Sequence, residues 1–168
     1  MLKVVKEVAA NGGLFRFKRE PKIRESVMET VRINFEPFIS EAARQFIVSG
    51  VEMYNIAATS LPEYFPVNFV LRGGHGDVLG GLLGLLWGGW LQVTHLWVAE
   101  AARGAGHGTR LMKDAEAYAR SLGAIGVTLE TYSFQARPFY ERLGYEVLST
   151  LDGYPVGHIK FFLRKTLV

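Results

Sequence analysis

The pattern of apolar and polar positions predicts a run of strands in the middle of the chain. Alternation predicts a strand over Val67–Leu71, followed by a turn at Gly73–Asp77. The uncharged run from Val78 to Leu91 is shorter than the roughly 20 residues that a membrane helix needs, and glycines interrupt it. We interpret it as two buried strands joined at Gly88-Gly89, the second of which extends from Trp90 to Val98.

A helical period follows these strands. From about Gly106 the apolar side chains recur at helical spacing and predict an amphipathic helix that Gly123 ends. Its predicted inner face is Leu111, Met112, Ala115, Tyr118, Ala119 and Leu122, and its predicted outer face is Arg110, Lys113, Asp114, Glu116 and Arg120. The remaining pattern predicts a strand, a short helix and two closing strands, over Ile125–Thr131, Gln135–Leu143, Tyr145–Leu151 and His158–Leu167.

The first part of the chain is less regular. We interpret residues 1–28, which are rich in basic side chains, as an N-terminal basic extension to one domain over residues 29–168. Val31–Phe35 alternates as a strand does, and Ser40 can cap a helix that runs toward Ile56. Strand–helix–strand order in the middle implies a parallel pair, and the flanking hairpins imply antiparallel pairs. The predicted fold class is therefore α/β (α+β), a mixed central sheet flanked by helices.

Composition and charge exclude several classes of protein. A chain of 168 residues that is 49% hydrophobic suits one folded domain. Cysteine is absent, which excludes disulfides, thiolate metal sites and a cysteine nucleophile, and fits a cytoplasmic location. The net charge of +3 is small, and no nucleic-acid-binding motif accompanies it. We expect no nucleic-acid partner, no membrane association and no metal.

A glycine-rich loop, Arg103-Gly104-Ala105-Gly106-His107-Gly108, lies between the predicted strand and the amphipathic helix. The first turn of a helix offers free N–H groups and a partial positive charge, and glycines leave room for a phosphate there. A P-loop would end in Gly-Lys-Ser/Thr, whereas Gly108 precedes Thr109-Arg110. A dinucleotide loop would need G-x-G-x-x-G, and this loop is one residue too short.

These residues resemble a known family. Leu96-Trp97-Val98, then Arg103, Gly106 and Gly108, resemble the acyl-CoA loop of the GNAT N-acyltransferase superfamily. Its hallmark is Arg or Gln, two residues, Gly, one residue, then Gly or Ala. A second segment that resembles the family, Pro138–Tyr145, follows at the expected distance. The chain is most similar to bacterial members that also carry Phe-Gln-Ala and Tyr-Pro-x-Gly-His, here Phe134-Gln135-Ala136 and Tyr154–His158.

The resemblance implies that the chain binds acetyl-CoA as co-substrate. It implies a pantetheine arm along the strand of Leu96 and Val98, with the Leu96 N–H polarising the acetyl carbonyl, and Tyr140 as proton donor to the CoA sulfur. The donor-binding residues expected from it are Leu96, Trp97, Val98, Arg103, Gly104, Ala105, Gly106, His107, Gly108, Thr109, Ser133 and Phe139. Ser133 stands where the family usually has Asn.

The general base stays open at this point. In many relatives an acidic residue or histidine lies four or two residues ahead of Leu96, but Gln92 and Thr94 hold those positions here. The remaining candidates are His95, Glu130 and His158. Direct attack by an amine that is already neutral, or proton removal through a water relay, is an equal alternative. A regular strand would turn His95 to the face opposite Thr94, because strand side chains alternate.

The main functional hypothesis is an N-acetyltransferase that acts on a primary amine of a small molecule or a peptide. The alternatives are a non-catalytic acetyl-CoA sensor or regulatory module, and an interaction domain whose basic extension meets an acidic partner. Formation of a homodimer is a further expectation. The acceptor cannot be read from the sequence, because one fold serves many acceptors.

Overall fold

The computed structural model describes residues 31–61 and 64–167, and the chain divides at Arg44–Gln45 into two units. Residues 31–40 form neither helix nor strand, so the strand predicted over Val31–Phe35 is wrong. A strand needs a neighbour for its backbone hydrogen bonds, and no described strand pairs with this segment. The extension predicted over residues 1–28 lies outside the described residues.

The helix predicted after Ser40 is confirmed as α3 (Glu41–Thr59). The Ser40 hydroxyl accepts a hydrogen bond from the Ala43 N–H (3.2 Å), and the Ser40 carbonyl accepts one from the Arg44 N–H (2.9 Å). Ser40 is thus a true N-cap, which satisfies an N–H that the first turn would otherwise leave free.

Six strands form one sheet in the order β1-β2-β3-β4-β6-β5. The strands are β1 (Phe65–Arg72), β2 (Val78–Trp87), β3 (Trp90–Val98), β4 (Gly126–Tyr132), β5 (Glu146–Asp152) and β6 (Ile159–Thr166). Only the β3–β4 pair is parallel. Two α-helices connect strands of this sheet, α4 (His107–Ser121) between β3 and β4 and α5 (Arg137–Arg142) between β4 and β5. The predicted mixed sheet with one parallel pair and flanking helices is confirmed.

The long apolar run after Val78 forms the β2–β3 hairpin. Gly88 and Gly89 both adopt positive φ values, 58° and 79°, which a two-residue turn between twisted strands requires. The run is therefore a pair of sheet strands, and no helix among the described residues is long and apolar enough to cross a membrane.

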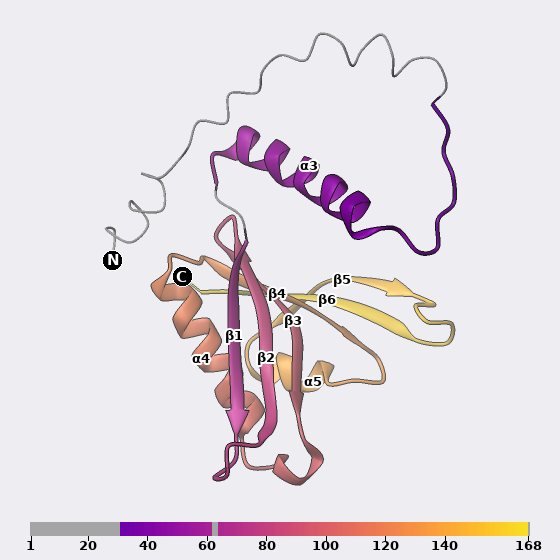
Figure 1. Cartoon of the computed structure of the whole chain (residues 1–168). Coiled ribbons are helices and arrows are strands. Elements are labelled where there is room, and N and C mark those ends of the chain that lie inside the picture. The colour runs from indigo at the N-terminus through magenta and orange to yellow at the C-terminus, as the bar shows by residue number, and fades with distance from the viewer. Residues whose placement is uncertain (1–30, 62–63, 168) are drawn as a thin grey trace. The chain divides into compact units, whose positions relative to one another are not determined.

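The core lies between the sheet and α4, which packs against β1, β2 and β3 (Figure 1). Leu111, Met112, Ala115 and Ala119 of the predicted inner face are buried, whereas Tyr118 and Leu122 stay partly exposed. Strand residues such as Leu82, Leu91, Val127 and Leu163 complete the core.

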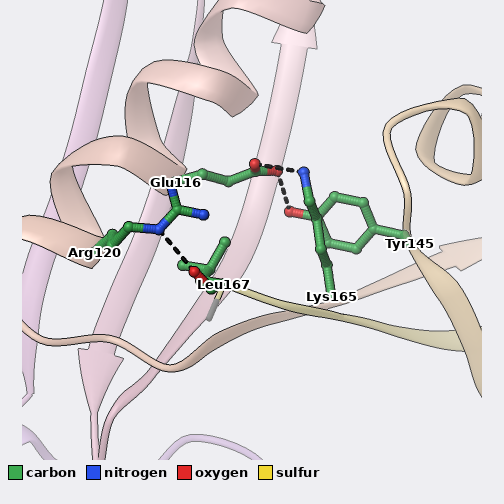
Figure 2. Close-up of polar contacts among 5 residues, drawn as sticks. All are labelled: Glu116, Arg120, Tyr145, Lys165 and Leu167. Carbon is green, nitrogen blue, oxygen red and sulfur yellow. Dashed lines mark hydrogen bonds and ion pairs between the residues drawn. The ribbon is translucent and has the colours of Figure 1, made fainter.

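Glu116 corrects the predicted outer face of α4, because its side chain is buried (7% exposed). Tyr145 donates a hydrogen bond to one carboxylate oxygen (2.9 Å), and Lys165 of β6 binds the other (2.6 Å), as Figure 2 shows. Burial and the neighbouring carboxylate raise the pKa of Tyr145 far above its ordinary value, so its hydroxyl remains a donor. A charge buried with two partners costs far less than one buried alone.

We expect Glu116→Gln to lower the free energy of unfolding by about 2–3 kcal/mol, since its amide would present N–H groups to the Lys165 ammonium. The melting temperature should fall by roughly 4–12 °C. Asp114→Asn on the same helix is the control, because the exposed Arg110–Asp114 pair (3.5 Å) is worth at most about 0.5 kcal/mol. Equal shifts in the two variants, measured by thermal unfolding, would contradict the assigned role of Glu116.

Candidate active site

The site opens where the parallel strands part. β3 and β4 pair only from Trp90–Gly126 to Val93–Leu129. Beyond that point lie two adjoining cavities. The strand cavity, about 580 Å³, lies between the ends of the two strands, and the loop cavity, about 500 Å³, lies over the glycine-rich loop. Both are lined by Leu96, Trp97, Arg103, Ala136 and Tyr140, so together they form one cleft.

A β-bulge at Thr94 shapes the β3 wall of the cleft. Leu83 of β2 pairs with His95 and Gly84 pairs with Val93, which leaves Thr94 without a partner residue. The extra residue shifts the alternation, and Thr94 and His95 both line the strand cavity. The His95 Nδ1 lies 3.1 Å from the Thr94 hydroxyl oxygen. The expectation that these side chains take opposite faces is therefore wrong.

The bulge also fixes which backbone groups of β3 face the cleft. The Ala99 N–H donates to the Leu79 carbonyl of β2 (2.7 Å), and the Val98 carbonyl accepts from the Arg103 Nε (2.9 Å) on the other side of the strand. Backbone groups alternate along an antiparallel strand. The N–H groups of Leu96 and Val98 consequently point away from β2, toward the side from which β4 has diverged.

The glycine-rich loop carries the chain into α4. Gly106 is the N-cap, with φ of 81°, and no side chain caps the helix. No heavy atom lies within 4 Å of where a Cβ of Gly106 would stand, and Gly106 lines the loop cavity. A side chain would project into open space at the helix start, where N–H groups and the helix dipole favour an anion. The loop therefore combines open space with a helix N-terminus, two features that an anion-binding loop requires.

Tyr140 of α5 lies where the two cavities meet. Its ring packs edge-on against Phe139 and Tyr145 at centroid distances of 5.1 and 6.0 Å, and the residue is 9% exposed. Burial raises the pKa of Tyr140, so the hydroxyl keeps its proton at neutral pH. Among the described residues none accepts a hydrogen bond from this hydroxyl. A proton donor is thus held free inside the cleft.

Comparison with known proteins identifies the family and supports the fold. The profile of the acetyltransferase (GNAT) family matches residues 29–145. The chain belongs to this family. A blasticidin-S acetyltransferase of Streptomyces morookaense is 46% identical over 96 residues, which cover 56% of this chain and 71% of that protein. An acetyltransferase of Agrobacterium fabrum is 34% identical over 73% of this chain and 90% of its own length.

A solved structure extends the comparison. A crystal structure of an acetyltransferase from Agrobacterium tumefaciens superposes with a TM-score of 0.76 and 29% identity, covering 81% of this chain and 99% of that one. The chain is accordingly an acyltransferase of the GNAT family.

Most site residues predicted from the sequence meet in the cleft of this GNAT enzyme. The loop cavity is lined by Leu96, Trp97, Val98, Arg103, Gly104, Gly106, His107, Gly108, Thr109, Phe139 and Tyr140. Ala105 and Ser133 line neither cavity. Ser133 instead joins the turn after β4 to the first residue of β6, because its hydroxyl accepts from the Ile159 N–H (3.2 Å) and its N–H donates to the Ile159 carbonyl (2.8 Å).

The candidate bases have different surroundings in the GNAT enzyme. His95 and Glu130 line the strand cavity, and His158 does not. Glu130 forms an ion pair with Lys160, and the hydrogen bond to Glu130 raises the pKa of that lysine. His158 is tied to the Ser133 hydroxyl through Nδ1 (3.2 Å). His95 alone of the three has a cavity position without an ionic partner among the described residues.

Sequence reasoning missed Arg142 and the role of Thr94. Arg142, the last residue of α5, lines the loop cavity and adds a second positive charge to that of Arg103. Its place within the family-like segment Pro138–Tyr145 was the available signal. Gln135 and Thr131 also line the strand cavity, where the Gln135 side-chain oxygen accepts hydrogen bonds from the Thr131 hydroxyl (3.2 Å) and the Tyr132 N–H (3.1 Å).

Proposed function

We propose that the protein is an N-acetyltransferase that moves the acetyl group of acetyl-CoA to a primary amine of a small molecule. The observation that carries the proposal is the cleft itself. It joins a phosphate cradle to a free, protonated tyrosine hydroxyl by way of the backbone N–H groups of Leu96 and Val98. Membership of the family favours an enzyme over a non-catalytic sensor.

The donor site is supported by the fit of the loop cavity to a nucleotide-bearing thioester. The cradle at Gly106 suits the pyrophosphate, and Arg103 and Arg142 supply charge and planar hydrogen-bond donors. The N–H groups of Leu96 and Val98 suit the amide groups of a pantetheine arm, which would continue the sheet at the position that β4 leaves. When bound, acetyl-CoA supplies an activated acetyl group.

Three groups of this chain would act on the transfer. The Leu96 N–H would donate to the developing oxyanion of the acetyl carbonyl. As the carbon–nitrogen bond forms, the amine loses a proton to a base, and as the carbon–sulfur bond breaks, Tyr140 gives a proton to the departing sulfur. The raised pKa of Tyr140 suits this role, because a neutral hydroxyl must still hold its proton when the thiolate leaves.

His95 is the base that the hydrogen bonding favours. The Thr94 hydroxyl has one proton, and it donates this proton to the Leu83 carbonyl (3.0 Å). In the contact between the two side chains, the Thr94 hydroxyl oxygen therefore accepts a hydrogen bond from the His95 Nδ1–H. Neutral His95 then has its lone pair on Nε2, which is free to take a proton from the acceptor amine directly or through water.

The acceptor class is supported by one of the two relatives described above. That relative is named for blasticidin S, a small molecule, and it is 46% identical over the matched 96 residues. That likeness favours a small-molecule acceptor over a peptide. The strand cavity of about 580 Å³ has the size range of small-molecule sites.

The donor site predicts a selective loss in Arg103→Ala. CoA should raise the melting temperature of the wild type by mass action, and the variant should need about 10-fold more CoA for the same rise, because one charge-assisted contact to phosphate is lost. Pantetheine, which lacks the phosphates, should stabilise both proteins equally.

Arg110→Ala is the matched control, since Arg110 lies in the first turn of α4 but outside the loop cavity. It should bind CoA within about twofold of the wild type, as expected for an exposed charge. If Arg103→Ala weakened the binding of CoA and of pantetheine equally, the loop would serve only as a turn and would not bind the phosphates.

A further inference from the structure

Three aromatic rings form a stack beside the cleft. Tyr132 and Phe134 lie nearly parallel, with centroids 5.2 Å apart and planes 12° apart, and Tyr132 and Tyr154 lie 6.1 Å apart at 21°. Phe134 is 56% exposed and Tyr154 is 50% exposed. A cluster of large, exposed aromatic side chains often marks a site that binds a ligand or a partner.

The stack is held in place by contacts between two loops. Tyr132 ends β4, Phe134 lies in the turn before α5, and Tyr154 lies in the loop between β5 and β6. The Ser133 hydrogen bonds to Ile159 and His158 join these segments. The His158 ring also meets Phe134 at 76°, with centroids 4.8 Å apart. Phe134 is therefore fixed between Tyr132 and His158 although its surface is open, so a ligand would bind it with little loss of side-chain entropy.

The stack is continuous with the catalytic cleft. Phe134 lines the strand cavity together with His95 and Tyr140. Glu130, which lines the same cavity, forms an ion pair with Lys160, and the Lys160 Nζ lies 5.2 Å from the centre of the Tyr154 ring. This wall of the cavity consequently presents an aromatic surface, to which the Glu130–Lys160 pair adds no net charge.

We propose that Phe134, supported by Tyr132 and His158, is the acceptor subsite, and that it selects a primary amine carried on a flat aromatic or heteroaromatic ring. The proposal rests on the proposed function. Phe134 contacts the ring of the acceptor, and the amine reaches toward His95 at the other side of the same cavity. Tyr132 and His158 act as positioning residues, because they orient Phe134 and do not line the cavity themselves.

The test uses two amines of equal length, 2-phenylethylamine and 2-cyclohexylethylamine. Wild-type protein should favour the phenyl compound by about 3- to 10-fold in kcat/KM, the worth of one aromatic pair. Phe134→Leu keeps an apolar side chain but removes the ring, so the ratio should fall to about one. Phe65→Leu changes an exposed ring of β1 outside both cavities and should keep the wild-type ratio.

A binding measurement separates this proposal from the proposed function. Saturation-transfer NMR with CoA present should detect 2-phenylethylamine on the wild type and a weaker signal on Phe134→Leu. Equal kcat/KM for the two amines, or a ratio unchanged by Phe134→Leu, would overturn the ring subsite while the acetyltransferase stands. Absence of turnover with every amine would overturn the proposed acetyltransferase function. The NMR comparison would still test the ring subsite, because equal binding of 2-phenylethylamine to the wild type and to Phe134→Leu would count against the subsite.

Discussion

Tyr140→Phe is expected to lower kcat by about 100-fold or more, the usual contribution of one positioned acid. The substitution keeps the ring that packs against Phe139 and Tyr145 and removes only the hydroxyl inside the cleft. Acetyl-CoA affinity should change little, so the loss should appear in kcat and not in KM. Steady-state kinetics with thiol release as the signal measures both.

Tyr145→Phe is the matched control for Tyr140. Both residues are buried tyrosines, but the Tyr145 hydroxyl binds Glu116 and lies in the core. Its variant should unfold at a lower temperature and keep kcat per folded molecule. A Tyr140→Phe protein that melts earlier and turns over normally would remove Tyr140 from the mechanism.

His95→Gln should lower kcat/KM by about 100-fold, because glutamine cannot take a proton from the acceptor amine. Thr94→Val should cause a smaller loss, since it removes the oxygen that holds the His95 Nδ1–H and lets the neutral imidazole adopt either tautomer. Thr94→Ser keeps a hydroxyl at this position and should therefore retain most of the activity that Thr94→Val loses. A purely structural role for Thr94 would not require the hydroxyl.

Glu130→Gln decides between the two bases that line the strand cavity. If His95 is the base, this variant should keep activity within a few-fold of the wild type, because the Glu130 carboxylate is already engaged by Lys160. A 100-fold loss in Glu130→Gln, together with near-normal activity in His95→Gln, would transfer the role to Glu130.

The sequence predicted most elements of the sheet because their signals are local. The Gly88-Gly89 turn, the helical period after Gly106, and the glycines that follow α4 and α5 (Gly123 and Gly144) are all set by residues close in the chain. The loop and the segment around Tyr140 were also predicted, because each is a contiguous motif.

The failures arise from contacts that are distant in the sequence. Glu116 looked solvent-facing by charge, but its partner Lys165 lies 49 residues away. The position of His95 depended on a bulge that appears only when β3 pairs with β2, since a strand taken alone gives regular alternation. The ring stack beside Phe134 likewise needs the β5–β6 loop to come back to the end of β4.

The most direct test of the central claim is acetyl transfer itself. Purified protein is incubated with acetyl-CoA and a panel of primary amines, while free thiol is followed and the products are analysed by mass spectrometry. We expect thiol release that depends on the amine and is matched by an amine product heavier by one acetyl group. Both signals should be about 100-fold slower in the Tyr140→Phe and His95→Gln variants. Thiol release that is the same with and without every amine, and no acetylated product, would contradict it.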